Sequence, residues 1–154
     1  MSTYIVVQVV SDCLSIPAKN DFIDWANAAI DNQSLERELT IRIVDEEEGK
    51  SLNKDWRQKE YATNILSFPM GDTVNEELNI LGDIVICAPV VLREAQEQNK
   101  PIQAHWAHLV IHGVLHLQGY DHQNDDEASE METKEITLLG NFGYANPYET
   151  NNVV

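Results

Sequence analysis

Residues 102–122 of this chain read IQAHWAHLVIHGVLHLQGYDH and combine a long helical pattern with all five histidines of the chain, three of them within residues 112–122. Apolar residues recur at helical spacing as far as Gln118, and the next residue is Gly119. Glycine tolerates the left-handed conformation in which many helices end. The stretch therefore predicts a helix over residues 102–118, after which the chain can reverse at Gly119.

Shorter elements are predicted on both sides of this helix. Strands are expected where Val and Ile predominate or alternate with polar residues, over 4–10, 40–44, 64–68 and 81–87. Helices are expected in segments with helical periodicity, over 17–30, 45–56, 89–99 and 126–139, and a polar loop over 70–79. This order predicts an α+β fold, in which about five helices pack around a small mixed β-sheet of about four strands.

Length and composition limit the class of protein. The chain has 154 residues, 43% of them hydrophobic, so a single domain over 1–154 with one core is expected, followed by a polar tail from about Asn146. No run approaches the ~18 apolar residues of a membrane span, and the N-terminus lacks the basic start of a signal peptide. Cys13 and Cys87 match no CxxC pattern, which favours two reduced thiols. These features predict a cytoplasmic protein without a membrane partner.

The charge balance is strongly acidic. Ten Lys and Arg stand against 26 Asp and Glu, which gives a formal net charge of −16 and should repel nucleic acid at long range. Half of the fixed positive charge falls within one segment, at Arg42, Lys50, Lys54, Arg57 and Lys59, where acidic residues are interspersed. The segment is therefore a modest local enrichment of positive charge on an acidic protein.

Three of the five histidines form a predicted metal site. His112 and His116 are four residues apart, so on a helix their rings project from one face about one turn apart. That spacing suits two nitrogens at ~2.0–2.1 Å from one ion. A continued helix would carry His122 ~9 Å further along and onto another face, whereas a reversal at Gly119 can bring it back. The site predicted from this pattern is His112, His116 and His122.

Two further residues, His108 and Asp121, are close enough in the sequence to be rival ligands. His108 shares the face of His112, but it lies ~12 Å along the axis from His116, which favours a role beside the ligands or as a solvated or core histidine. Asp121 could be a fourth ligand or a neighbour of the site, although adjacent Asp121 and His122 cannot easily face one ion. Three protein ligands leave a position for a metal-bound water, whose pKa the ion lowers toward ~7. We therefore expect a catalytic metal site.

The histidine spacing also resembles that of zincin proteases, which place Glu directly after the first histidine as the general base. This chain has Gly113 at that position. Without the carboxylate, peptide hydrolysis by the usual route lacks its proton acceptor. The pattern therefore disfavours a protease.

Three segments, HGxLHLxGYDH from 112 to 122, TNILSFP from 63 to 69 and LGDIVIC from 81 to 87, resemble the YbeY family of bacterial endoribonucleases. The likeness runs from about Ile41 to Tyr148. It implies a mixed sheet with surrounding helices, and one metal ion, usually zinc, on His112, His116 and His122. It also implies single-strand-specific RNA cleavage in 16S rRNA maturation and quality control of the small ribosomal subunit. Ala62 departs from the family, in which many members have Pro, and this concerns only the conformation of a loop.

The resemblance also implies a functionally important arginine, matched here by Arg57 in the segment WRQKEYATN. A guanidinium can meet two nonbridging phosphate oxygens in parallel, which suits phosphodiester hydrolysis. The alternative is a surface ion pair with Asp55 or Glu60. Ser67 and Phe68 are candidates for lining the cleft, Phe68 either as a base-stacking ring or as a core residue.

The sequence leaves three functions open. The first is a metal-dependent endoribonuclease with one divalent ion, Zn²⁺ or alternatively Ni²⁺, and no nucleotide cofactor. The second is a metal-dependent hydrolase of peptides or small phosphoesters. The third is a ribosome-assembly factor with a structural metal. The charge of −16 gives weight to the third, because an acidic protein meets ribosomal RNA more readily through proteins of the small ribosomal subunit than directly.

Overall fold

Four short strands pair into one mixed sheet in the computed structural model, which describes residues 4–13, 15–31, 38–57, 63–69, 80–120 and 124–148. The strands are β1 (Tyr4–Val9), β2 (Glu38–Val44), β3 (Ile65–Pro69) and β4 (Ile80–Cys87). Their spatial order is β1-β2-β4-β3; β1, β2 and β4 run parallel, and β3 runs antiparallel to β4. Runs of Val and Ile suit strands that are covered by helices.

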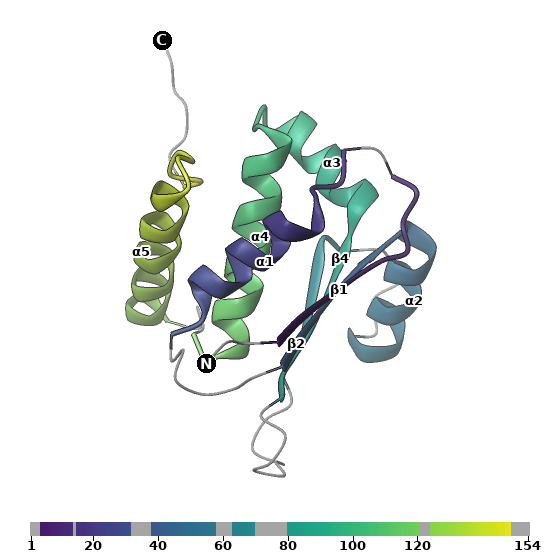
Figure 1. Ribbon diagram of the computed structural model, residues 1–154, viewed down its shortest axis with the longest axis horizontal. Coiled ribbons are helices and arrows are strands. Elements are labelled where there is room, and N and C mark those ends of the chain that lie inside the picture. The colour runs from purple at the N-terminus through teal and green to yellow at the C-terminus, as the bar shows by residue number, and fades with distance from the viewer. Residues whose placement is uncertain are drawn as a thin grey trace.

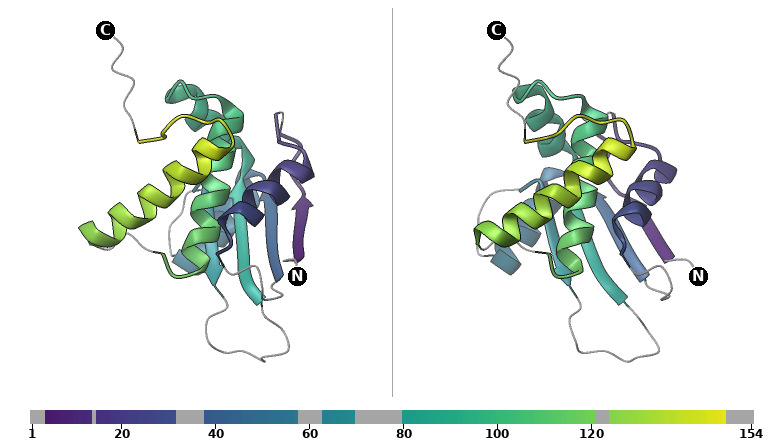
Figure 2. Two further views of the ribbon diagram at one scale, coloured as in Figure 1. Left: turned by 60° about the vertical axis from the view of Figure 1, so that its left-hand side comes forward. Right: turned by 90° about the vertical axis from the view of Figure 1, so that its left-hand side faces the viewer.

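Five helices are present within the described residues: α1 (Lys19–Ala29), α2 (Glu46–Arg57), α3 (Ala88–Glu97), α4 (Ile102–Leu117) and α5 (Asp125–Asn141). Figure 1 and Figure 2 show α1 and α4 on one face of the sheet, α2 on the other, and α5 packed on the outer side of α4. The predicted α+β fold is therefore confirmed, with its mixed sheet and surrounding helices.

The main core lies between the sheet and the helices α1 and α4. Ten of the 16 residues of α4 are buried, as expected of a helix that is covered on most of its surface. Trp106 of α4 meets Phe22 of α1 edge to face at 5.4 Å between ring centroids. The sheet contributes four fully buried isoleucines, Ile41, Ile43, Ile84 and Ile86. This apolar packing makes α4 a rigid support for the side chains on its remaining face.

A second, smaller cluster lies on the opposite face of the sheet. Its buried members are Val44, Leu66, Val85, Cys87 and Val90, and Leu52 of α2 and Phe68 of β3 pack against them. Burial raises the pKa of the Cys87 thiol. Both cysteines remain thiols, as predicted. The cluster explains how the acidic helix α2 is attached to the sheet.

Two glycines fix the course of α4. Gly119 has φ +102°, and the turn is closed by Gly119 N to His116 O at 3.0 Å and Tyr120 N to Leu115 O at 3.2 Å. The helix therefore ends at the glycine, as the sequence predicted. A Cβ on Gly113 would lie 2.9 Å from Ile65 Cδ1, so α4 approaches β3 too closely for an unshifted side chain there. The residue after the first histidine is thus constrained by packing.

The boundaries of the elements differ little from those predicted. The helix predicted from Pro17 begins only at Lys19, because Ala18 is extended with ψ 153°. The predicted loop over 70–79 lies outside the described residues.

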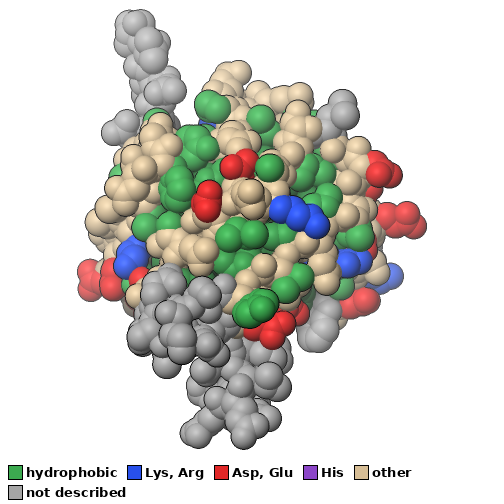
Figure 3. Space-filling model, in the orientation of Figure 1, with side chains coloured by type: hydrophobic (Ala, Val, Ile, Leu, Met, Phe, Trp, Pro, Cys, Tyr) green, Lys and Arg blue, Asp and Glu red, His purple; other side chains and the backbone are tan. Residues whose placement is uncertain are grey.

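At the sheet edge, β1 leaves Tyr4, Val6 and Val9 exposed, and Figure 3 shows apolar side chains spread over this face among scattered charges. Across the described part of the chain, no helix has the length and apolar character needed to span a membrane.

Candidate metal centre

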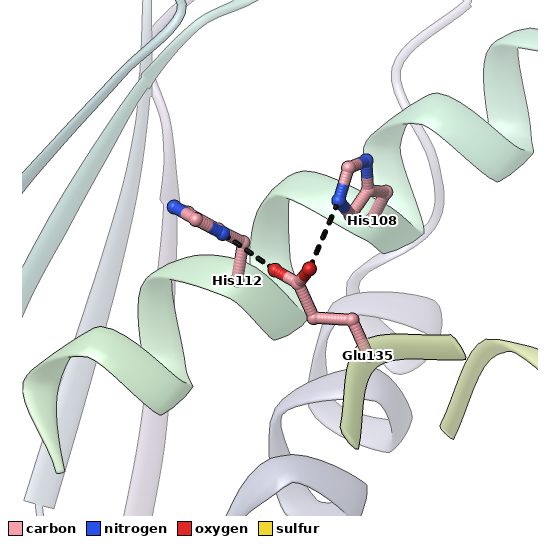
Figure 4. A group of neighbouring side chains, drawn as sticks. All are labelled: His108, His112 and Glu135. Atoms are coloured by element: carbon pink, nitrogen blue, oxygen red, sulfur yellow. Dashed lines mark hydrogen bonds and ion pairs between the residues drawn. The ribbon is translucent and has the colours of Figure 1, made fainter. Parts of the chain in front are cut away.

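His112 is held by a buried carboxylate from the neighbouring helix. Its Nδ1 lies 2.5 Å from Oε1 of Glu135, which projects from α5 and is 0% exposed (Figure 4). The second oxygen of Glu135 accepts a hydrogen bond from the Tyr148 hydroxyl and lies 3.5 Å from His108 Nε2. His108 Nε2 is also 3.2 Å from the Tyr148 hydroxyl. One carboxylate thus joins α4, α5 and the segment that follows α5.

Glu135 is ionised at neutral pH in this environment. Burial acts to raise its pKa, but the hydrogen bonds from His108, His112 and Tyr148 outweigh burial and lower the pKa to about 2. Burial and the bond to Glu135 both raise the pKa of Tyr148. A carboxylate only accepts hydrogen bonds, so Nδ1 of His112 is the protonated ring nitrogen toward Glu135. That tautomer assigns metal coordination by His112 to Nε2.

His116 is also held at Nδ1, in this case by a backbone carbonyl. Its Nδ1 lies 3.2 Å from the carbonyl oxygen of Tyr120, in the turn that Gly119 begins. A carbonyl only accepts, so Nδ1 of His116 donates and Nε2 is the nitrogen assigned to an ion. Two histidines one helical turn apart are therefore held in the tautomer in which Nε2 would be the nitrogen that binds a metal ion.

The turn after His116 is fastened to α1 and α5. The Tyr120 hydroxyl donates to Asp31 Oδ2 at 2.8 Å, and Lys134 Nζ lies 2.8 Å from Asp31 Oδ1. Gln118 donates to the carbonyl of Ala29 at 2.7 Å and accepts from the backbone of Asp31 at 2.8 Å. The hydrogen bond to Asp31 raises the pKa of Tyr120 and of Lys134. These contacts hold the backbone that leads toward residue 122.

The donor groups present fit a borderline divalent ion such as zinc, which prefers imidazole nitrogen and carboxylate oxygen. One group of neighbouring potential ligands comprises His108, His112 and Glu135, whose ligand atoms lie within 4.8 Å of one another. The pair predicted from the sequence, His112 and His116, shares His112 with this group. The described residues therefore support a metal ion near His112.

The other predicted site residues divide into three sets. His122 and Asp121 lie outside the described residues, as does the side chain of Arg57, which ends α2. Ser67 pairs with Ile84 of the core and so lies on the α4 face of the sheet. Phe68 lies on the opposite face, in the cluster under α2. Phe68 therefore packs under α2, and its role as a base-stacking ring, like the role of Ser67 in lining the cleft, stays a prediction.

Sequence reasoning missed Glu135 and Tyr148. A signal for Glu135 was present, because it stands between Met131 and Leu139 at steps of four residues in the apolar stripe of α5. A carboxylate at the centre of such a stripe indicates a buried partner. Tyr148 gave no comparable signal, since its segment is polar and short.

The α+β fold and the potential metal ligands around His112 are those expected of a metal-dependent hydrolase. A family profile described as endoribonuclease YbeY matches residues 8–143. Proteins named endoribonuclease YbeY are similar over most of the chain. That of Nitrosococcus oceani is 52% identical over 97% of this chain and 99% of its own length, and that of Stutzerimonas stutzeri 59% identical over 86% and 83%.

The fold is also similar to the solution structure of TM1509 from Thermotoga maritima, with a TM-score of 0.60 and 25% sequence identity. The match covers 94% of this chain and 99% of that chain. The chain belongs to the endoribonuclease YbeY family. This confirms the resemblance and the prediction of a hydrolase of the endonuclease class.

Proposed function

We propose that this protein is an endoribonuclease that cleaves single-stranded RNA with one divalent metal ion on His112, His116 and His122. The observation that carries the proposal is the shared orientation of His112 and His116. Each is bound at Nδ1 by a fixed acceptor, one a carboxylate and the other a backbone carbonyl. Membership of the endoribonuclease YbeY family supports RNA as the substrate class.

The ion itself is Zn²⁺ in this proposal, with Ni²⁺ as the alternative, because imidazole ligands suit both. When bound, such an ion supplies Lewis acidity for hydrolysis of a phosphodiester. The residues of the chain supply orientation. His112 and His116, each held at Nδ1 by an acceptor, would offer Nε2 to the ion, and Gly119 ends the helix at the turn that leads toward His122.

Arg57 binds the phosphate in this proposal. Its guanidinium would hold two nonbridging oxygens and stabilise the charge that builds on them in the transition state. A glutamate at Gly113, where a zincin protease carries its general base, would bring its Cβ to 2.9 Å from Ile65 Cδ1 and force that side chain to shift. This packing supports a phosphodiester rather than a peptide as the substrate.

Ribosomal RNA is the proposed substrate, cleaved during maturation of 16S rRNA and quality control of the small subunit. A net charge of −16 gives poor electrostatic affinity for free RNA. On the face shown in Figure 3, blue side chains are scattered among red and green ones. We therefore propose that a basic protein of the small ribosomal subunit presents the RNA to the enzyme.

Cleavage assays with the zinc-loaded protein test the proposal. Single-stranded ribosomal RNA, the same sequence as a duplex, a peptide and a small phosphodiester are incubated with wild type and with His116→Ala. The expected result is cleavage of the single-stranded RNA by wild type alone, faster when small-subunit proteins are added. Intact RNA in every mixture, with folded and zinc-loaded wild type, would contradict the endoribonuclease proposal. Cleavage of only the peptide or the small phosphodiester would indicate the other hydrolase.

A further inference from the structure

Glu135 is a charged side chain in a fully buried position. It is 0% exposed and stands in the apolar stripe of α5 with Met131 and Leu139, which are 1% exposed each. A carboxylate in such a place is tolerated only when donors satisfy its oxygens. Both oxygens of Glu135 have donors. His112 occupies Oε1, and Tyr148 with His108 occupies Oε2.

The spacing of His112 and Glu135 is that of a hydrogen bond and not of two ligands on one ion. Two ligands of a tetrahedral zinc ion, each ~2.0–2.1 Å from the metal, lie about 3.3 Å apart. Nδ1 of His112 and Oε1 of Glu135 lie 2.5 Å apart, which leaves space only for a proton between them. The nitrogen of His112 that faces Glu135 is therefore not the nitrogen that faces the ion.

His108 belongs to the same hydrogen-bonded group. Its Nε2 lies 3.2 Å from the Tyr148 hydroxyl and 3.5 Å from Oε2 of Glu135, on the side of the carboxylate away from His112 (Figure 4). The rings of His108 and His112 are 6.2 Å apart between centroids and nearly perpendicular, at 79°. His108 and Tyr148 thus fix the second oxygen of the carboxylate whose first oxygen fixes His112.

We propose that Glu135 is a positioning residue that orients His112 toward the metal ion, and that neither Glu135 nor His108 binds the ion. Tyr148 and His108 hold Glu135 in place, so residues after α5 contribute to the metal centre without touching the ion. The inference rests on the proposed function in one respect, because it takes His112 and His116 as ligands.

Zinc affinity is the direct readout. Loss of a group that orients a ligating histidine lowers metal affinity by about 10- to 100-fold. Glu135→Gln keeps the shape but removes the charge, and Glu130→Gln, an exposed change on the same helix, is the matched control. Affinities are measured by competition with a chromophoric chelator at one pH. We expect a loss of about 10- to 100-fold for Glu135→Gln, little change for His108→Gln, and none for Glu130→Gln.

The absorption spectrum of the Co²⁺-substituted protein separates orientation from ligation. A positioning residue can be replaced without a change in the ligand set, so Glu135→Gln should keep the shape and intensity of the cobalt bands. Bands altered by both Glu135→Gln and His108→Gln, with affinity losses equal to that of His112→Ala, would make Glu135 and His108 ligands. That outcome would overturn the inference.

Tyr148→Phe keeps the test decisive if Glu135→Gln does not fold. It removes the hydroxyl that donates to Glu135 and contacts His108, on a partly exposed side chain, and we expect zinc affinity to fall about two- to tenfold. Suppose that Tyr148→Phe, and Glu135→Gln if it folds, bind zinc with wild-type affinity, while His112→Ala and His116→Ala lose zinc. That result overturns the inference and leaves the proposed function standing. Retention of zinc by both histidine variants would instead overturn the proposed function.

Discussion

Two carboxylates from neighbouring helices pair with histidines of α4, and the pairs Glu94–His105 and Glu135–His112 differ in which ring nitrogen the carboxylate contacts. Glu94 of α3 lies 3.0 Å from Nε2 of His105, and its other contact is with the Asn64 amide. Glu135 of α5 lies 2.5 Å from Nδ1 of His112. Each pair joins α4 to a neighbouring helix. The two pairs have the same chemical groups, but the carboxylate contacts Nε2 of the ring in one and Nδ1 in the other.

Exposure separates the two pairs further. The His105 side chain is 5% exposed, and its Nδ1 is buried with no hydrogen-bond partner among the described residues. The His112 side chain is 29% exposed, and its ring points Nε2 away from Glu135 (Figure 4). The ring of His105 is therefore buried in the structure, and we call Glu94–His105 the closed pair. The ring of His112 is partly exposed, and its Nε2 points toward the proposed metal site. In these two pairs, the ring nitrogen that the carboxylate contacts and the exposure of the ring separate the structural histidine from the proposed ligand.

The largest expected effect is the loss of RNA cleavage when a proposed ligand is replaced, compared with replacement of the structural histidine His105. His112→Ala and His116→Ala should each lower RNA cleavage at least about 1,000-fold, because the Lewis acid is lost with its ligands. His105→Gln should retain zinc and cleavage but unfold at lower urea concentration, since it disturbs a buried hydrogen bond. Steady-state cleavage and urea titration measure the two effects. Cleavage lost in His105→Gln while the protein stays folded would break the comparison.

Arg57 provides the next effect. It lies in neither pair, so its removal should leave zinc affinity and stability unchanged while RNA cleavage falls about 100- to 1,000-fold. Arg57→Lys should recover only part of the rate, because an ammonium cannot hold two phosphate oxygens in parallel. Lys54→Ala, one turn earlier on α2, is the control for lost positive charge. Equal losses in Lys54→Ala and Arg57→Ala would reduce Arg57 to a general electrostatic role.

Much of the fold follows from local physics in the sequence. The helix over 102–118 and its end at Gly119 were predictable, because apolar periodicity and a glycine act within a few residues. The strands were predictable from their runs of Val and Ile. The start of α1 was placed two residues too early, since Pro17 is compatible both with a first helical turn and with the extended segment found before Lys19.

The partners of the histidines were harder to predict. Glu94 and Glu135 come from separate helices, and acidic residues are so numerous in this chain that composition does not single out the two. Tyr148 follows a segment without periodicity, although its hydroxyl reaches a buried carboxylate. His112 and His116 were predictable as a pair because both lie on one helix. Partners that meet only through tertiary packing need the structure.

Removal of the metal should lower the thermal stability of the protein moderately. The core between the sheet and α4 is apolar and the pair at His105 is closed, so chelation should leave a folded protein. Zinc at about 100 times its dissociation constant adds about 2.7 kcal/mol. For a domain of this size the melting temperature should rise by about 5–11 °C on zinc addition. Calorimetry with and without chelator measures it. Complete unfolding on chelation would favour an assembly factor with a structural metal.

The smallest expected effect is the pH dependence of the closed pair. Burial acts to raise the pKa of Glu94, but hydrogen bonds from His105 and Asn64 outweigh it and lower the pKa below its usual value. A carboxyl group with a lowered folded pKa stabilises the protein above its unfolded pKa of ~4.3, and the contribution is lost as pH falls through the folded value. Glu94→Gln should therefore cost about 1 kcal/mol at pH 7 and progressively less in more acidic solution. Urea unfolding of the wild type and Glu94→Gln, from pH 7 down to below the folded pKa of Glu94, measures the difference. Glu97→Gln on the same helix is the control. A constant difference at every pH would show that the charge of Glu94 adds nothing to the hydrogen bond with His105.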